Sequence, residues 1–472
     1  MMSRSRPMIG PQANGMHVFT RRTTLLLMVA LYVFGVAIGL VYNVGKHRSL
    51  EFEAVDFDFY MQFAAKAFDP SSTGRYAVNP EGRNIYGLAD VEGQRGLHQT
   101  LHFEPVKYVY AALYGWTGSP IALFIFIAVC YFAPLLYLAL IATGASIREN
   151  IFVLLVGLAY VLYPSTPRMV SFDLRPRIFV IPALVVLILA IIYSRPMSEK
   201  MLWFILFLLA REEAVVLAPL LLALDYLRGR MNDQRTRVVP FVLIWATAVA
   251  AVVLYYRWTG YARDPVGHPW TSYVPEHAVA MWTVQFARQE SVPSRVGRVV
   301  HDILLAPDFT ILFVIVLLGL LAARRRIAPR PWTMRVLGLV VAACAAIQLV
   351  VGLRDLPRYR TAARQAHPVF DLRRTTDRLR TVILTDYKTS QAFNDYENLL
   401  VYERLPWFAV GARTERFYPH NAPLVRAALS TNVEYVVVRN SHLPAVTALM
   451  TDARVESRTV RQNRDYTILR IR

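Results

Sequence analysis

Residues 24–42 read TLLLMVALYVFGVAIGLVY and carry no charge. A run of about 20 apolar residues is long enough for a helix that crosses a bilayer. Arg21 and Arg22 precede this run, and no small-residue cleavage site follows it. The pattern therefore predicts an uncleaved first membrane helix rather than a secretory signal peptide, with residues 1–23 as a cytoplasmic tail.

The composition extends this prediction to much of the chain. Hydrophobic residues make up 55% of the 472 residues, above the roughly 45–50% of soluble domains. The net charge of +19 does not indicate nucleic-acid binding, because the arginines gather in short loops between apolar segments. Cys130 and Cys344 lie inside apolar runs, so neither a disulfide framework nor a thiolate metal site is expected.

Eight further apolar segments predict an α-helical polytopic membrane domain over residues 24–353, with about nine membrane helices. Several segments are shorter than the roughly 20 residues of a full span, which predicts tilted, broken or re-entrant helices. The segments are Pro120–Thr143, Ile151–Tyr163, Ile178–Tyr193, Met201–Ala210, Ala214–Leu227, Val238–Tyr256, Phe309–Ala323 and Val336–Leu353.

Basic residues predict the orientation, because cytoplasmic loops carry an excess of arginine and lysine. Alternate loops are basic, and all of them fall on the side of the N-terminus. These residues are Arg148, Arg195, Lys200, Arg228, Arg230, Arg235, Arg237, Arg324, Arg325, Arg326 and Arg330. The extracytoplasmic side then receives residues 44–104, 164–177, 211–213 and 257–308.

Residues 354–472 are predicted to form a soluble α/β domain, because hydropathy falls there and short β-rich runs alternate with helical ones. Residues 382–384 and 434–438 are expected as strands, and Ala422–Leu429 as a helix. An odd number of crossings places this domain outside the cytoplasm. Asp386 and Asp395 within it are expected to be solvated.

Asp56 and Asp58 alternate with aromatic residues just after the first membrane helix. On a helix the two side chains diverge by about 200°, whereas in an extended segment they share a face. Acids poised at a bilayer surface point to chemistry there. Solvated loop acids are the alternative interpretation.

The stretch His102-Phe103-Glu104-Pro105 precedes a predicted interfacial helix, Val106–Tyr114, whose first turn suits Pro105. His102 is a candidate proton carrier, metal ligand or helix-capping group. No second histidine stands at a clear ligand spacing, so a divalent cation held by carboxylates and lipid phosphate is favoured over a histidine site.

Two further groups of charged residues interrupt apolar segments. Asp173, Arg175 and Arg177 lie in a short loop, where arginine suits a phosphate or carboxylate partner; pairing with Asp173 or snorkelling to headgroups is the alternative. Arg211, Glu212 and Glu213 separate segments of ten and fourteen residues that are too short for both to span. These three residues are therefore expected at membrane depth, either as a functional group or as an ion network that fixes helix packing.

No phosphate-loop, dinucleotide, metalloprotease or Gly-x-Ser-x-Gly spacing occurs in the sequence. The order of the motifs resembles instead the predicted membrane proteins of domain of unknown function 2079 (DUF2079), which look like GT-C glycosyltransferases. The resemblance covers about residues 56–228, with Met61 and Arg175 departing from the family pattern. The matching residues are Asp56, Gln62, His102, Phe103, Pro105, Phe172, Asp173, Pro176, Glu212 and Glu213.

The resemblance implies a transferase in the cell membrane that takes a sugar from a polyprenyl-phosphate donor. The acceptor is an extracytoplasmic glycan, lipid or protein hydroxyl. Asp56 is the implied general base, with Asp58 or Glu104 assisting it or holding a divalent cation. The implied substrate-binding residues, with the arginines neutralising the lipid phosphate, are His102, Asp173, Arg175, Arg177, Arg211, Glu212 and Glu213.

A transporter or a non-catalytic scaffold is the alternative class, because intramembrane charges and broken helices also mark substrate pathways. The sequence contains no detectable inverted repeat, and its long first extracytoplasmic loop fits a transferase better. A scaffold predicts that Asp56 and Arg211 tolerate substitution, and a transferase predicts that they do not.

Overall fold

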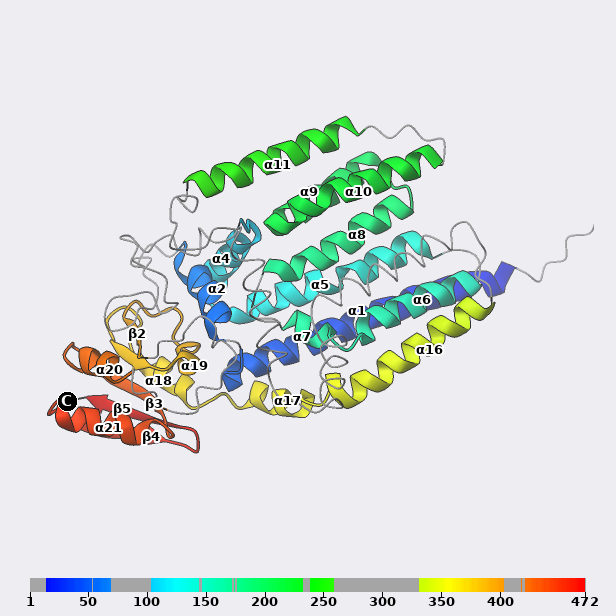
Figure 1. Ribbon diagram of the computed structural model, residues 1–472. Coiled ribbons are helices and arrows are strands. Elements are labelled where there is room, and N and C mark those ends of the chain that lie inside the picture. The colour runs from blue at the N-terminus through cyan, green and yellow to red at the C-terminus, as the bar shows by residue number, and fades with distance from the viewer. Residues whose placement is uncertain are drawn as a thin grey trace, which may run out of the picture.

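The chain forms a bundle of long helices with a small sheet domain at one end (Figure 1). The computed structural model describes residues 14–52, 54–68, 103–143, 147–171, 174, 176–231, 238–258, 331–402, 417 and 421–471. The bundle therefore combines an N-terminal half with the segment that begins at residue 331.

Two described helices are long and apolar enough to cross a membrane. The first lies within α1 (Asn14–Ser49), over Arg21–Ser49, and the second is α5 (Pro120–Ala142). In α5, Ser119 accepts a hydrogen bond from the backbone N–H of Ile121, and Pro120 occupies the first position, where its missing N–H costs nothing.

Shorter apolar helices complete the described part of the bundle, so the predicted count of about nine membrane helices is not established. The predicted segment Phe309–Ala323 lies outside the described residues. The remaining bundle elements are α6 (Ile147–Leu162), α7 (Thr166–Val170), the 3₁₀ turn η2 (Pro176–Phe179), α8 (Val180–Ile192), α9 (Met197–Ala210), α10 (Glu212–Met231), α11 (Val239–Trp258), α16 (Pro331–Ile347) and the π-helical turn η3 (Gln348–Gly352).

Apolar side chains on the outer helices face away from the protein. Leu26, Val216, Leu254 and Leu339 lie on α1, α10, α11 and α16 and are exposed by 64 to 79%. In contrast, α8 is buried along nearly its whole length. Outward-facing apolar surface on several helices at once is typical of lipid contact.

Two sequence expectations about helix extent are wrong. The segments on either side of Arg211 were expected to be ten and fourteen residues long, but α9 has 14 residues and α10 has 20. The stretch 44–104 was expected to be a loop, but α1 continues to Ser49 and α2 (Ala54–Lys66) follows it. Charged residues at helix ends hide the true helix bounds from a hydropathy reading.

The C-terminal segment contains a five-stranded mixed sheet in the order β2-β1-β3-β5-β4. β1 pairs in parallel with β2 and β3, whereas β5 is antiparallel to β3 and β4. The elements are α17 (Leu356–Arg364), α18 (Val369–Thr375), β1 (Ile383–Thr385), α19 (Tyr387–Ser390), β2 (Leu399–Val401), α20 (Ala422–Leu429), β3 (Tyr435–Arg439), α21 (Leu443–Asp452), β4 (Ser457–Gln462) and β5 (Tyr466–Ile471).

Alternating strand residues face two separate cores, as expected for a sheet covered on both sides. Ile383 and Val437 face one core, and Leu384 and Val436 face the other. The predicted strands at 382–384 and 434–438 correspond to β1 and β3, and the predicted helix Ala422–Leu429 is α20. The α/β pattern read from the sequence is confirmed.

Candidate functional site

A break between two helices creates the centre of the candidate site. α9 ends at Ala210 and α10 begins at Glu212, with Arg211 between them in an extended conformation (φ −171°, ψ 159°). The backbone N–H of Ala214 donates to the Arg211 carbonyl at 3.0 Å, which closes the first turn of α10. The side chain of this extended residue reaches Glu104, just before the start of α4 (Val106–Thr117).

Glu104 receives that side chain just before α4. Its Oε1 lies 3.2 Å from Arg211 Nε, and its Oε2 accepts a 2.9 Å hydrogen bond from the Tyr60 hydroxyl of α2. Glu212 Oε1 lies 3.7 Å from the same Arg211 Nε. The Glu104 side chain is 0% exposed, Glu212 6% and Arg211 12%. Three segments distant in sequence thus meet at one buried ion pair network.

Lys107 adds a second cation in the first turn of α4. The Nζ atom donates to the Tyr255 hydroxyl of α11 at 3.4 Å and lies 5.5 Å from the centre of the Phe63 ring. Burial lowers the pKa of Lys107 to about 8, although the nearby charges of Glu104 and Glu212 oppose that shift. The ammonium therefore loses its proton far more easily than a solvated lysine.

We call Tyr60, Glu104, Lys107, Arg211 and Glu212 the charged cluster. It contains two cations and two carboxylates, so its formal charge is balanced. Desolvating four ionisable groups costs several kcal/mol per ion, and mutual pairing offsets that cost only when the geometry is good. Such a balanced, buried group can bind a phosphate if the incoming anion replaces one carboxylate as the partner of a cation.

The comparisons with known proteins bear on this region. Residues 82–266 match the family model of predicted membrane proteins DUF2079. The resemblance stated from the motifs is thereby confirmed over these residues, and with the apolar helices it supports a membrane location. No curated protein matches the chain.

The DUF2079 match differs in extent from the expected resemblance. It starts after Asp56 and Gln62, which were expected to match the family, and it continues beyond residue 228. Within the charged cluster it contains every member except Tyr60. The matched region therefore includes both cations and both carboxylates of the cluster.

The structure brings together three of the residues predicted for the site, Glu104, Arg211 and Glu212. Asp56 and Asp58 lie on α2, so the helical alternative for this stretch is the correct one. Their side chains lie outside the described part of the structure. The same holds for the side chains of His102, Asp173, Arg175, Arg177 and Glu213.

Sequence reasoning missed three residues that complete the site, Tyr60, Lys107 and Tyr255. Lys107 had a usable signal, since a lysine three residues after Glu104 interrupts an otherwise apolar helix. Tyr60 follows Asp56 by one helical turn, which becomes informative only once α2 is known to be a helix. Nothing in the sequence near Tyr255 distinguishes it from other interfacial aromatic residues.

The C-terminal domain holds α2 from the side opposite the cluster. Gln62 Nε2 donates to Asn394 Oδ1 at 3.4 Å, and Lys66 Nζ donates to the Tyr396 carbonyl at 2.7 Å. Gln391 Nε2 donates to the Phe52 carbonyl at 2.9 Å, just before α2. Burial lowers the pKa of Lys66 to about 8. The position of α2 therefore depends on the segment that follows α19.

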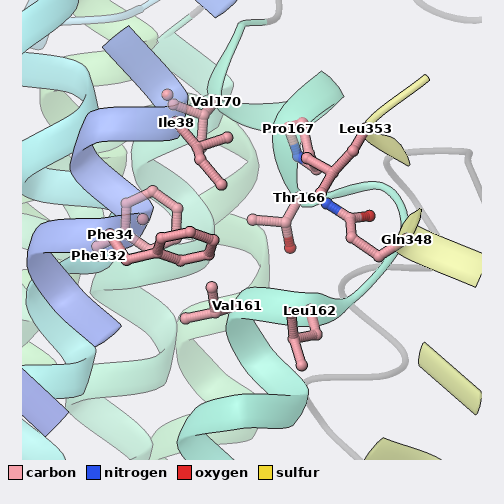
Figure 2. A pocket seen from close by; sticks show the side chains of 12 residues that line it. Phe34, Ile38, Phe132, Val161, Leu162, Thr166, Pro167, Val170, Gln348 and Leu353 are labelled. Atoms are coloured by element: carbon pink, nitrogen blue, oxygen red, sulfur yellow. The ribbon is translucent and has the colours of Figure 1, made fainter. Parts of the chain in front are cut away.

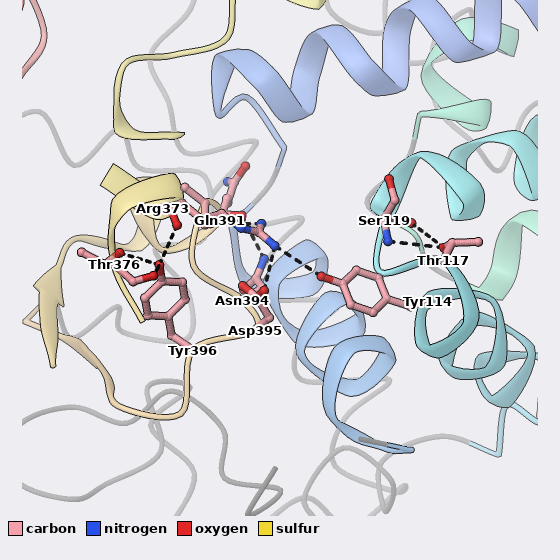
Figure 3. A network of polar contacts seen from close by, with 10 residues as sticks. Tyr114, Thr117, Ser119, Arg373, Thr376, Gln391, Asn394, Asp395 and Tyr396 are labelled. Atoms are coloured by element: carbon pink, nitrogen blue, oxygen red, sulfur yellow. Dashed lines mark hydrogen bonds and ion pairs between the residues drawn. The ribbon is translucent and has the colours of Figure 1, made fainter. Parts of the chain in front are cut away.

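A second contact ties the same domain to α4 (Figure 3). Arg373 of α18 forms a 2.7 Å ion pair with Asp395 and lies 3.5 Å from the Tyr114 hydroxyl. Figure 3 shows Arg373 between the two partners, with Asn394 alongside Asp395. Both helices that carry cluster residues, α2 and α4, thus contact the C-terminal domain.

The expectation that Asp386 and Asp395 are solvated is wrong. The Asp386 side chain is 0% exposed, forms a 2.9 Å ion pair with Arg439 and caps α19 through the Thr389 N–H at 2.8 Å. Asp395 is 10% exposed and pairs with Arg373. Asp386 directly follows β1, where the sheet brings it beside Arg439 of the neighbouring strand β3. The order of the strands in the sheet cannot be read from the sequence, so this partner was not predicted.

A separate small apolar pocket lies between α1, α5, α6, α7 and η3 (Figure 2). Phe34, Phe132 and Val170 form its apolar wall, while Thr166 and Gln348 supply the polar atoms. None of its lining residues is ionisable. The pocket shares no residue with the charged cluster, so the two are separate features of the described structure.

Among the described residues, no group of three or more histidine, cysteine, aspartate or glutamate side chains is arranged to hold a metal ion. The resemblance implies Asp58 or Glu104 as the residue that holds a divalent cation; the Asp58 side chain lies outside the described residues, and Glu104 is paired with Arg211.

Proposed function

We propose that the protein is a membrane glycosyltransferase of the GT-C type that transfers a sugar from a polyprenyl-phosphate donor to an extracytoplasmic acceptor. The buried charged cluster carries this proposal, since it brings Glu104, Arg211 and Glu212 together as the family resemblance implies. The cluster lies at the end of the bundle next to the C-terminal domain (Figure 1). In this proposal that end is the extracytoplasmic one.

Arg211 and Lys107 are the residues proposed to bind the lipid phosphate. Negative charge accumulates on this group as it leaves, and cations fixed in a dry site stabilise that charge more strongly than solvated ones. Glu104 and Glu212 hold the Arg211 guanidinium in place at 3.2 and 3.7 Å. Arg175 and Arg177 are proposed to assist from the neighbouring loop.

Asp56 is the proposed general base. It precedes Tyr60 by four residues on α2, and residues one helical turn apart share a face. Tyr60 in turn donates to Glu104, so this face of α2 is turned toward the cluster. Glu104 itself is a poor base, because its two oxygens already face Tyr60 and Arg211.

The proposed reaction is a single displacement with inversion. The acceptor hydroxyl gives its proton to the Asp56 carboxylate as its oxygen forms a bond to the anomeric carbon. The bond between that carbon and the phosphate oxygen breaks, and its electron pair leaves with the polyprenyl phosphate. No oxidant or second nucleophile is required.

Transfer of radiolabelled sugar from a panel of polyprenyl-phosphate sugars to membrane acceptors tests the proposal. Membranes contain wild type, Asp56→Asn, Arg211→Lys or the control Asp452→Asn at matched protein levels; Asp452 is exposed on α21. We expect transfer by wild type and control, loss with Asp56→Asn, and reduced transfer with Arg211→Lys, because lysine lacks the planar fork. Parallel samples with EDTA or added Mg²⁺ measure the metal requirement.

No transfer with any donor would contradict the enzymatic proposal and favour a transporter or scaffold. Transfer that survives Asp56→Asn would remove Asp56 as the base while leaving the transferase assignment in place. Transfer that is equal in wild type and Arg211→Lys would show that a point charge suffices at that position.

A further inference from the structure

A short basic helix lies where the bundle meets the C-terminal domain. α17 begins four residues after η3 ends and packs on the last turns of α1 (Figure 1). Its Tyr359 is buried, with the ring 5.2 Å from that of Tyr42. A Cβ at Gly45 would lie 2.6 Å from the Tyr359 carbonyl oxygen, so the two backbones approach closely. α17 is therefore fixed to α1 and is not a loose linker.

This position lies at the boundary of the apolar part of the bundle. The uncharged apolar run of α1 ends at Tyr42, and the apolar helix formed by α16 and η3 ends at Val350. α17 follows the second end and contacts the first. A helix at the ends of two lipid-facing helices lies at the level of phospholipid headgroups.

The exposed surface of α17 and of the chain just before it is strongly basic. Arg358, Arg360 and Arg364 of α17 are exposed, as is Arg354 just before the helix; α17 itself contains no acidic residue, and Asp355 precedes it. Arg358 and Arg360 flank the buried Tyr359, so the arginines occupy both sides of the helix. Arg358 forms an ion pair with Glu51. Within the described residues, no ion pair involves the other three arginines.

The spacing of these arginines makes them repel one another. Arg360 and Arg364 are four residues apart on α17, and like charges at that spacing destabilise an isolated helix by about 0.2–0.5 kcal/mol. An anion bound across them removes the repulsion. The guanidinium fork matches phosphate oxygens in a bidentate manner.

We propose that α17 is a binding surface for the phosphate headgroups of anionic phospholipids in the surrounding bilayer. The exposed arginines supply charge complementarity, and the contact of α17 with α1 holds them at headgroup level. The inference is independent of the proposed transferase activity, because none of its residues belongs to the charged cluster. Bound lipid would fix α17, and through it the junction between the bundle and the C-terminal domain.

Native mass spectrometry of the delipidated full chain, titrated with phosphatidylglycerol or phosphatidylcholine, tests this proposal. The variant is the triple substitution Arg354→Gln, Arg360→Gln and Arg364→Gln. One basic residue near an anionic surface contributes about 1 kcal/mol, or about fivefold in affinity. We therefore expect the apparent Kd for phosphatidylglycerol to rise about 100-fold, with that for phosphatidylcholine unchanged.

Two control variants make the result specific. Lysine at the same three positions keeps the charge and should hold the affinity within about fivefold of wild type. Glutamine at Arg454, Arg458 and Arg464, three exposed arginines of the C-terminal domain, should leave binding unchanged. A change below twofold in the α17 variant, or an equal loss in the C-terminal control, would overturn the proposal.

Discussion

The interaction between Glu104 and Arg211 provides a quantitative test of the charged cluster. Glu104→Gln removes the charge that faces Arg211 Nε at 3.2 Å but preserves the shape and an acceptor for Tyr60. Removing one partner of a buried ion pair costs 3–5 kcal/mol, because the other charge stays buried without compensation. Glu212, 3.7 Å from Arg211, compensates in part. We expect a loss of about 3 kcal/mol in the free energy of unfolding.

A double-mutant cycle with Arg211→Met isolates the pairwise contribution. Unfolding in mixed dodecylmaltoside and sodium dodecyl sulfate micelles, followed by tryptophan fluorescence, gives the free energies. The coupling should be about 2–3 kcal/mol, since the double variant no longer buries an uncompensated guanidinium. The exposed pair Arg426 and Asp452, at 3.8 Å, should give less than about 1 kcal/mol. A Glu104–Arg211 coupling as small as that of the exposed pair would refute the reasoning.

Three further predictions concern the surroundings of the cluster. Burial lowers the pKa of Lys107 from 10.5 to about 8. Between pH 8 and 10.5 the folded state therefore binds fewer protons than the unfolded state, so the free energy of unfolding should rise with pH across this window. Lys107→Met should reduce that rise when unfolding is measured as a function of pH. Arg373→Met should speed amide hydrogen exchange in α2 and α4, because it removes the contacts to Asp395 and Tyr114. The control Arg374→Met alters a largely exposed side chain and should leave that exchange unchanged. Gly45→Ala should lower the free energy of unfolding by about 1–3 kcal/mol through overpacking against α17. Gly338 has open space around it, so Gly338→Ala should be neutral or stabilising. Thermal unfolding of both variants measures the difference.

The membrane helices were the part of the fold most readily predicted from sequence. A long uncharged run such as residues 24–42 has few alternatives to a spanning helix, and α1 and α5 bear this out. The conformation of α2 was left open, because acids and aromatics alternate at its start, a pattern equally compatible with an extended segment. Its helical state depends on packing against α4 and α19, which sequence patterns do not reveal.

The candidate site was predictable only where ionisable residues interrupt apolar runs. Arg211 and Glu212 drew attention because burying such groups is costly unless they pair, and the structure pairs Arg211 with both Glu212 and Glu104. Their other neighbours come from distant segments. Asp386 is the opposite case. It lies in a polar stretch and was expected to be solvated, but it is buried and paired with Arg439 of the neighbouring strand β3.

The contacts that hold α2 have a consequence for how the protein is made. Gln62, Lys66 and Phe52 bond to residues that are 330 to 339 positions later in the chain. At a synthesis rate of roughly 5–20 residues per second, those partners leave the ribosome tens of seconds after α2 does. During that interval the nascent chain lacks the contacts that hold α2, the helix that carries Tyr60 of the charged cluster. A chain that terminates before residue 390 would therefore be expected to remain a substrate for membrane quality control.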